Sequence, residues 1–131
     1  MRQIFKVLLL LFITILPLLS GAQEVQFSSS TRLLIQRLKS YKTLKPGSQK
    51  EINELNKEFV IGVSGNKVMT GAMLKVNEDI DVKRLKKLGV EINTNAGGIL
   101  TARIPVNKLE KLKRVKGLVL VDINFSVQTR Q

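Results

Sequence analysis

Hydrophobic and polar positions between Lys67 and Phe125 follow two periods in turn, and their order predicts six short elements. Residues 67–76 alternate between two sides, as a strand does, and residues 82–88 then carry an apolar residue every three positions, as one side of a helix does. The remaining segments repeat these two patterns. The sequence therefore predicts strands at 67–76, 90–94, 99–104 and 118–123, with helices at about 82–88 and 107–115.

Residues at the predicted boundaries support these limits. Asp79 or Asp81 can cap the first helix, because a carboxylate accepts hydrogen bonds from unpaired backbone N–H groups. Asn107 and Glu110 have the spacing of a capping box for the second helix. Gly117 follows that helix, where a residue free to take a positive φ is favoured.

This order of elements predicts an α+β fold. Two β-α-β crossovers give a four-stranded antiparallel sheet with both helices on one face, the ferredoxin-like βαββαβ plait. The expected core consists of the inward-facing residues of all six elements: Ala72, Leu74, Val76, Val82, Leu85, Leu88, Val90, Ile92, Leu100, Ala102, Ile104, Leu109, Leu112, Val115, Val119, Val121 and Ile123.

Residues 23–58 are predicted to form a helical arm and a linker ahead of this unit. Ser28–Ser30 offer N-caps to a helix whose apolar stripe consists of Leu34, Leu38 and Tyr41. Residues 48–58 fit either a short helix or an ordered linker. Phe59–Val63 is expected to form a hairpin with the strand at 67–76, because Ser64-Gly65-Asn66 is typical of a turn.

The first 22 residues have the pattern of a secretory signal peptide. Arg2 and Lys6 provide positive charge, Val7–Leu19 is mostly apolar, and Ser20-Gly21-Ala22 provides small residues for cleavage. A membrane anchor is the alternative, but this stretch is short for a span of about 20 residues. We therefore expect export, to the medium or to the periplasm and cell envelope.

The sequence offers little for catalysis or for metal binding. It contains no histidine and no cysteine, which removes the most frequent base near neutral pH, disulfides and thiolate metal ligands. Glu78, Asp79 and Asp81 form an acidic cluster, but the other positions of a calcium loop are absent, and carboxylates at a helix N-terminus complement its dipole. We expect no enzymatic activity, no metal and no cofactor.

The formal net charge of +12 suggests an anionic partner. RNA binding on this fold would need aromatic residues on the strand at 99–104, and that strand has none. The lysine-rich helix surfaces are either solvated or bind an anion, and the second alternative describes a secreted envelope adaptor with an anionic partner. The basic residues on the two predicted helices are Lys83, Arg84, Lys86, Lys87, Lys108, Lys111, Lys113, Arg114 and Lys116.

The sheet face opposite the helices is expected to be open and largely apolar. Methionine adapts to irregular partners, and a contiguous exposed apolar surface usually marks an interface. The alternative is that the helical arm folds back over this face. Alternation places on it Met69, Met73, Ile99, Thr101, Arg103, Leu118 and Leu120.

Several segments resemble the N-terminal prodomain of secreted bacterial subtilisin-like serine proteases. They are Val68–Val76, Leu88–Thr94, Gly98–Pro105 and Gly117–Val119, within a resemblance that covers residues 59–125. The resemblance implies a module that assists folding of a protease and then inhibits it. The implied docking face is Met69, Met73, Ile99, Thr101 and Arg103, and the implied cleft-occupying, flexible tail is Ser126, Val127, Gln128, Thr129, Arg130 and Gln131.

The chain departs from this family in one respect. The Asp, His and Ser segments of a subtilisin-like triad are absent, and the lack of histidine leaves no place for the triad elsewhere. The sequence leaves three alternatives open: a fragment of a longer reading frame, a decayed gene product, or a freestanding inhibitor. The protease would accordingly be bound in cis or in trans.

Overall fold

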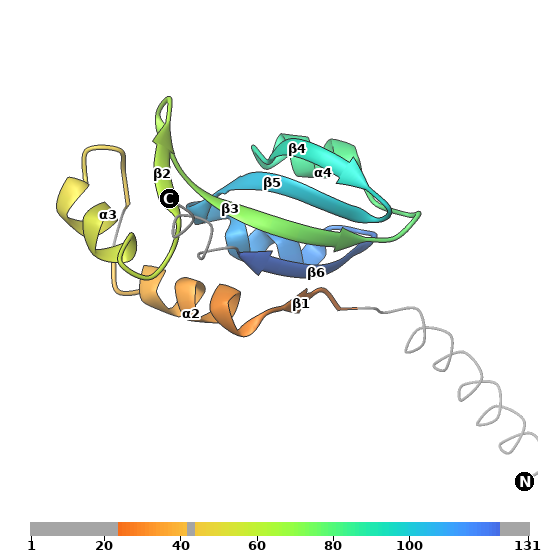
Figure 1. Cartoon of the computed structure of the whole chain (residues 1–131), viewed down its shortest axis with the longest axis horizontal. Helices are drawn as coiled ribbons and strands as arrows, with labels where there is room; N and C mark the ends of the chain where they lie inside the picture. Colours follow the sequence, from red (N-terminus) through yellow and green to blue (C-terminus); the bar gives the residue numbers. More distant parts are fainter. Residues whose placement is uncertain (1–23, 42–43, 124–131) are drawn as a thin grey trace, which may run out of the picture.

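One sheet of six strands organises the chain in the computed structural model, which describes residues 24–41 and 44–123 (Figure 1). The strand order is β1-β6-β3-β5-β4, and β2 pairs with the free part of the β3 edge. The predicted signal peptide and the predicted tail lie outside the described residues. The strands are β1 (Gln26–Phe27), β2 (Ile61–Ser64), β3 (Lys67–Val76), β4 (Glu91–Ala96), β5 (Ile99–Pro105) and β6 (Leu118–Ile123). The helices are α2 (Ser29–Leu38), α3 (Gln49–Leu55), α4 (Val82–Lys87) and the 3₁₀ helix η1 (Val106–Arg114).

The α+β class is confirmed, but the sheet is larger than the expected four-stranded antiparallel plait. Residues ahead of the predicted unit extend it, because an open sheet edge offers unpaired N–H and C=O groups. Gln26 and Phe27 pair with β6 in parallel, which makes the sheet mixed. The predicted hairpin is confirmed: β2 runs antiparallel to β3, and Gly65 provides the positive φ of 61° in the turn.

The second predicted helix is a 3₁₀ helix. A 3₁₀ helix has three residues per turn, so residues at i and i+3 lie directly above one another. The apolar residues of this segment recur at every third position, and this period matches 3₁₀ geometry. The predicted cap at Asn107 is wrong, because η1 begins at Val106 and has no side-chain cap. The resulting buried row is Val106, Leu109, Leu112 and Val115.

Two irregularities in the sheet change which side chains share a face. The β3–β6 register shifts next to Val76, so Leu118 pairs with Val76 and is only 4% exposed. The β4–β5 register shifts between Ile92 and Thr94, so Thr94 lies opposite Thr101. A bulge inserts one unpaired residue and thereby reverses the alternation beyond it. The placement of Leu118 on the open face is therefore wrong.

Most of the predicted core is buried on the helix side of the sheet. Val82 is an error, since it begins α4 and is 37% exposed. Val76 and Ile92 are partly buried against the core, and Val119 has intermediate exposure. The core also contains Val68 of β3 and residues from the arm and from the segment before β3, namely Phe27, Leu34, Ile52, Leu55, Phe59 and Ile61.

The helical arm extends this core and leaves the opposite sheet face open. Leu34 of α2 is fully buried, and Leu38 and Tyr41 pack against the same cluster. Figure 1 shows α2 running beside β6 at the edge of the sheet. Residues 49–55 form the helix α3, which resolves the alternative between a helix and a linker.

Thr31 attaches the start of α2 to the end of β6. Its side chain is fully buried, and its hydroxyl donates to the Val121 carbonyl (2.9 Å) and accepts from the Ile123 N–H (3.1 Å). Ser28 caps the helix as predicted, since its hydroxyl accepts from the Thr31 N–H. The Ser28 backbone N–H donates to the same Val121 carbonyl (3.0 Å). Beyond Ser28, the Thr31 side chain continues the contact with β6 that the backbone of β1 begins.

Candidate functional site

The sheet face opposite the helices remains accessible at its centre. Met73 of β3 is 39% exposed and Ile99 of β5 is 41% exposed. Thr101 is exposed, and the side chain of Arg103 is 41% exposed. Four of the five residues of the expected docking face therefore lie on an accessible surface. Met69, the fifth, pairs with Pro105 and Gly62 and is only 2% exposed.

Strand pairing places polar and apolar side chains next to each other on both sides of this face. Toward β4, the hydroxyls of Thr94 and Thr101 lie 2.6 Å apart, and Arg103 forms a 3.5 Å ion pair with Glu91. Toward β6, Met73 lies beside Asp122 and Lys75 beside Leu120, which is partly buried. Sequence reasoning missed Thr94 on this face, because the bulge that sets its position leaves no signal in the alternation. Glu91 precedes the bulge and lies opposite the core residue Ile92 in the alternation, but the expected docking face did not include it.

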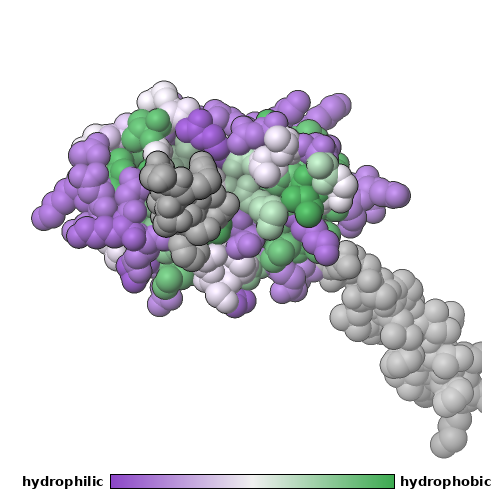
Figure 2. All heavy atoms as spheres, in the orientation of Figure 1, coloured by the Kyte–Doolittle hydropathy of each residue, from purple (hydrophilic) through white to green (hydrophobic). Residues whose placement is uncertain are grey.

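Gly71 presents no side chain in the middle of the face. It pairs with Arg103 on β5, and a Cβ placed at Gly71 would meet no atom within 4 Å. In the space-filling view of this side, hydrophobic and near-neutral residues lie together to the right of the grey atoms, with hydrophilic residues among them and along the outline (Figure 2). A flat, mixed surface with a polar rim is typical of a protein interface.

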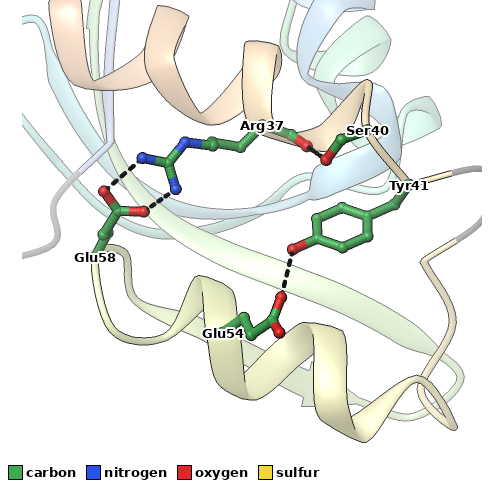
Figure 3. A network of polar contacts seen from close by, with 5 residues as sticks. All are labelled: Arg37, Ser40, Tyr41, Glu54 and Glu58. Atoms are coloured by element: carbon green, nitrogen blue, oxygen red, sulfur yellow. Dashed lines mark hydrogen bonds and ion pairs between the residues drawn. The ribbon is translucent and has the colours of Figure 1, made fainter.

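A second polar cluster joins α2 to α3 (Figure 3). Arg37 forms a two-pronged ion pair with Glu58, in which Nη2 donates to Oε1 at 2.9 Å. The Tyr41 hydroxyl donates to Glu54 Oε2 at 3.3 Å. Both ion-pair partners are well exposed, so the pair contributes about 0–1 kcal/mol and serves mainly to orient the two helices.

The titration of Tyr41 provides a test of this cluster. Burial, followed by the nearby Glu54 carboxylate, raises the pKa of Tyr41 above its ordinary value of 10.0. The folded state therefore keeps the phenol proton longer than the unfolded state does. The associated stabilisation is present below pH 10.0 and is lost as pH rises through the folded pKa.

We expect the tyrosinate absorbance of the folded chain to reach its midpoint above pH 10.0, and the Glu54→Gln variant to lower that midpoint. The chain has a single tyrosine and no tryptophan, so the spectrum reports this group alone. Glu51→Gln is the matched control, because the Glu51 charge also raises this pKa, but less. An equal or larger decrease with Glu51→Gln would contradict the Tyr41–Glu54 contact.

The acidic cluster between β3 and α4 has a structural role. Asp81 accepts from the Arg84 N–H at 3.0 Å and caps α4, as predicted. The Asp79 N–H donates to the Asn77 side chain at 2.8 Å, which stabilises the turn before the helix. Within residues 24–41 and 44–123, no group of three or more acidic side chains is arranged to hold a metal ion. No helix in that part of the chain is long and apolar enough to cross a membrane.

Comparisons with known proteins identify no relative of this chain: no family model, no curated protein and no solved structure matches it.

Proposed function

We propose that this chain is a non-enzymatic module that binds a subtilisin-like serine protease through its uncovered sheet face, as a propeptide-like folding assistant and inhibitor. The exposure of Met73 and Ile99 carries the proposal. The chain has an arm with an apolar stripe of its own, yet that stripe packs on the helix side and beside β6. The sheet face is therefore available to another protein.

The ferredoxin-like unit belongs to this proposal. The strands β6, β3, β5 and β4 are adjacent in that order and antiparallel, and α4 and η1 connect them. In this interpretation, β1 and β2 are additions: β1 pairs with the outer edge of β6, and β2 pairs with the part of β3 that β6 leaves unpaired. The docking face belongs to the central unit alone.

The shape of the face fits an interface formed with helices. A sheet surface with no side chain at Gly71 and exposed apolar side chains at Met73 and Ile99 allows the backbone of a helix to approach closely. The Arg103–Glu91 pair and the two threonine hydroxyls form its polar border. Polar groups at such a border favour one orientation of the partner more than they add affinity.

The tail, residues 126–131, is the second part of the proposal. It follows β6, whose last residue, Ile123, is fixed by Thr31. We assign it to the substrate cleft of the protease, where an extended peptide binds as an added strand. The sheet face then supplies most of the affinity, and the tail blocks the cleft.

The test is inhibition of peptidase activity. Refolded residues 23–131 are mixed with subtilisin-like proteases of the same organism, and the inhibition constant is measured with and without residues 126–131. We expect inhibition by the longer form and its loss, with binding retained, when the tail is removed. Absence of inhibition and of binding with every such enzyme would refute the proposal.

A further inference from the structure

The 3₁₀ geometry of η1 places three cations in a straight row. Lys108, Lys111 and Arg114 are separated by three residues each, and η1 has three residues per turn. The three side chains therefore leave the helix in one direction. At a rise of 2.0 Å per residue, successive positions are about 6 Å apart. An α-helix would instead spread them over a wide arc.

The buried row of η1 fixes the direction of this basic row. Leu109 and Leu112 are at most 1% exposed and pack against the sheet. The cations at neighbouring positions then point away from the core: Lys111 and Arg114 are exposed, and Lys108 is partly exposed. The row therefore lies on the helix side of the molecule, away from the docking face.

Within the part of the chain that the structure describes, no residue of the row forms an ion pair, although Glu110 lies in the same helix. The ion pairs there join Arg37 to Glu58 and Arg103 to Glu91, and neither includes a residue of η1. The Lys111 ammonium lowers the pKa of Lys108, which shows that the like charges are close enough to interact. An anion bound along the row would relieve this repulsion.

The surroundings of the row argue for a partner recognised by charge alone. Residues 106–116 contain no aromatic side chain that could stack on a base. The apolar residues of η1 itself (Val106, Leu109 and Leu112) are buried, so the helix offers no apolar side chain to enter a lipid surface.

From this arrangement we infer that the row of Lys108, Lys111 and Arg114 binds a linear polyphosphate chain. The negative charges of polyphosphate repeat along one line, and the polymer has no aromatic ring that would need a stacking partner. It therefore complements an evenly spaced line of cations. Lysine binds phosphate oxygens as a point charge, and arginine can add a two-pronged contact at the end of the row. This inference uses the side of the sheet opposite the docking face and does not depend on a protease.

The test is a calorimetric titration of the full chain with long-chain inorganic polyphosphate. The variant Lys108→Gln/Lys111→Gln/Arg114→Gln removes the row. The variant Lys83→Gln/Lys86→Gln/Lys87→Gln removes the same charge from exposed positions of α4, which share one helix face but do not form a straight, evenly spaced row. Unfolding midpoints of both variants verify that each is folded.

We expect the row variant to bind polyphosphate at least about tenfold more weakly and the α4 variant less than about threefold more weakly. The slope of log affinity against log salt should decrease by about two in the row variant, because three fewer counterions are released. Orthophosphate and anionic phospholipid vesicles should bind far more weakly than the polymer. Equal losses in both variants, absence of polyphosphate binding, or tighter binding to vesicles would overturn the inference.

Discussion

Replacing Gly117 with alanine is expected to destabilise the fold by at least about 3 kcal/mol, a large share of a typical stability of about 5–15 kcal/mol. Gly117 has a φ of +83°, which alone costs an L-residue about 1–2 kcal/mol. An added Cβ would also lie 2.2 Å from the backbone nitrogen of Ile80.

The loop cannot easily move away from such a Cβ. The Asn77 N–H donates to the Gly117 carbonyl and the Asp81 N–H to the Lys116 carbonyl, both at 2.9 Å. These bonds hold the β3–α4 connection against the start of β6. Moving the loop to relieve the clash would break these backbone hydrogen bonds, and this cost adds to the strain of a positive φ at alanine.

Gly97→Ala is the matched control for this prediction. Gly97 also has a positive φ, 59°, but its added Cβ would meet nothing within 4 Å. We expect it to lose only the backbone term of about 1–2 kcal/mol. Urea unfolding followed by circular dichroism measures both variants. Equal losses would show that the close approach to Ile80 is not important.

Replacing Thr31 with valine is expected to cost about 2–3 kcal/mol. Valine keeps the shape of threonine and removes only the hydroxyl. The buried Ile123 N–H then loses its acceptor, and leaving a buried polar group without a partner costs about 1–3 kcal/mol. Val121 loses one of its two donors, and the bond between the Ser28 and Thr31 hydroxyls is also lost.

Ser30→Ala is the control in the same helical turn. The Ser30 hydroxyl contacts the Ser28 hydroxyl (3.0 Å), Asp122 (3.3 Å) and the Ile123 carbonyl (3.4 Å), but Ser30 is only partly buried, so we expect a loss below about 1 kcal/mol. Hydrogen exchange gives a residue-specific readout, because the Ile123 amide should exchange faster only in the Thr31→Val variant. Unchanged protection of that amide would contradict the role given to Thr31.

Local patterns predicted most of the strands and their limits. The bounds predicted for 67–76 and 118–123 are those of β3 and β6, because alternation and flanking turn residues act within a few positions. The caps at Ser28 and Asp81 are local as well and were predicted. The predicted four-stranded antiparallel sheet is smaller than the observed one. Pairing of β1 with β6 joins residues far apart in the sequence, and local patterns do not reveal such pairs.

Local sequence patterns did not predict several side-chain positions in the candidate site. The two register shifts decide that Leu118 points to the core and Thr94 to the open face, and a bulge depends on the partner strand. The three-residue period at 106–115 fits the 3₁₀ helix η1, but residues 82–88 have the same period and form the α-helix α4, so the period alone does not distinguish the two helix types. The burial of Met69 beside Gly62 and Pro105 has no signal in strand alternation.

The role of the uncovered face is tested most directly by two pairs of substitutions of equal exposure. Met73→Asp/Ile99→Asp introduces two charges on the face, and Leu33→Asp/Val63→Asp introduces two charges at apolar positions that are 40% and 44% exposed elsewhere. Each pair is measured as the inhibition constant of residues 23–131 against the same subtilisin-like protease. We predict at least about tenfold weaker inhibition for the first pair, because burying unpaired charge opposes binding, and little change for the second. Inhibition unchanged in the first pair, or weakened equally in both, would contradict docking through this face.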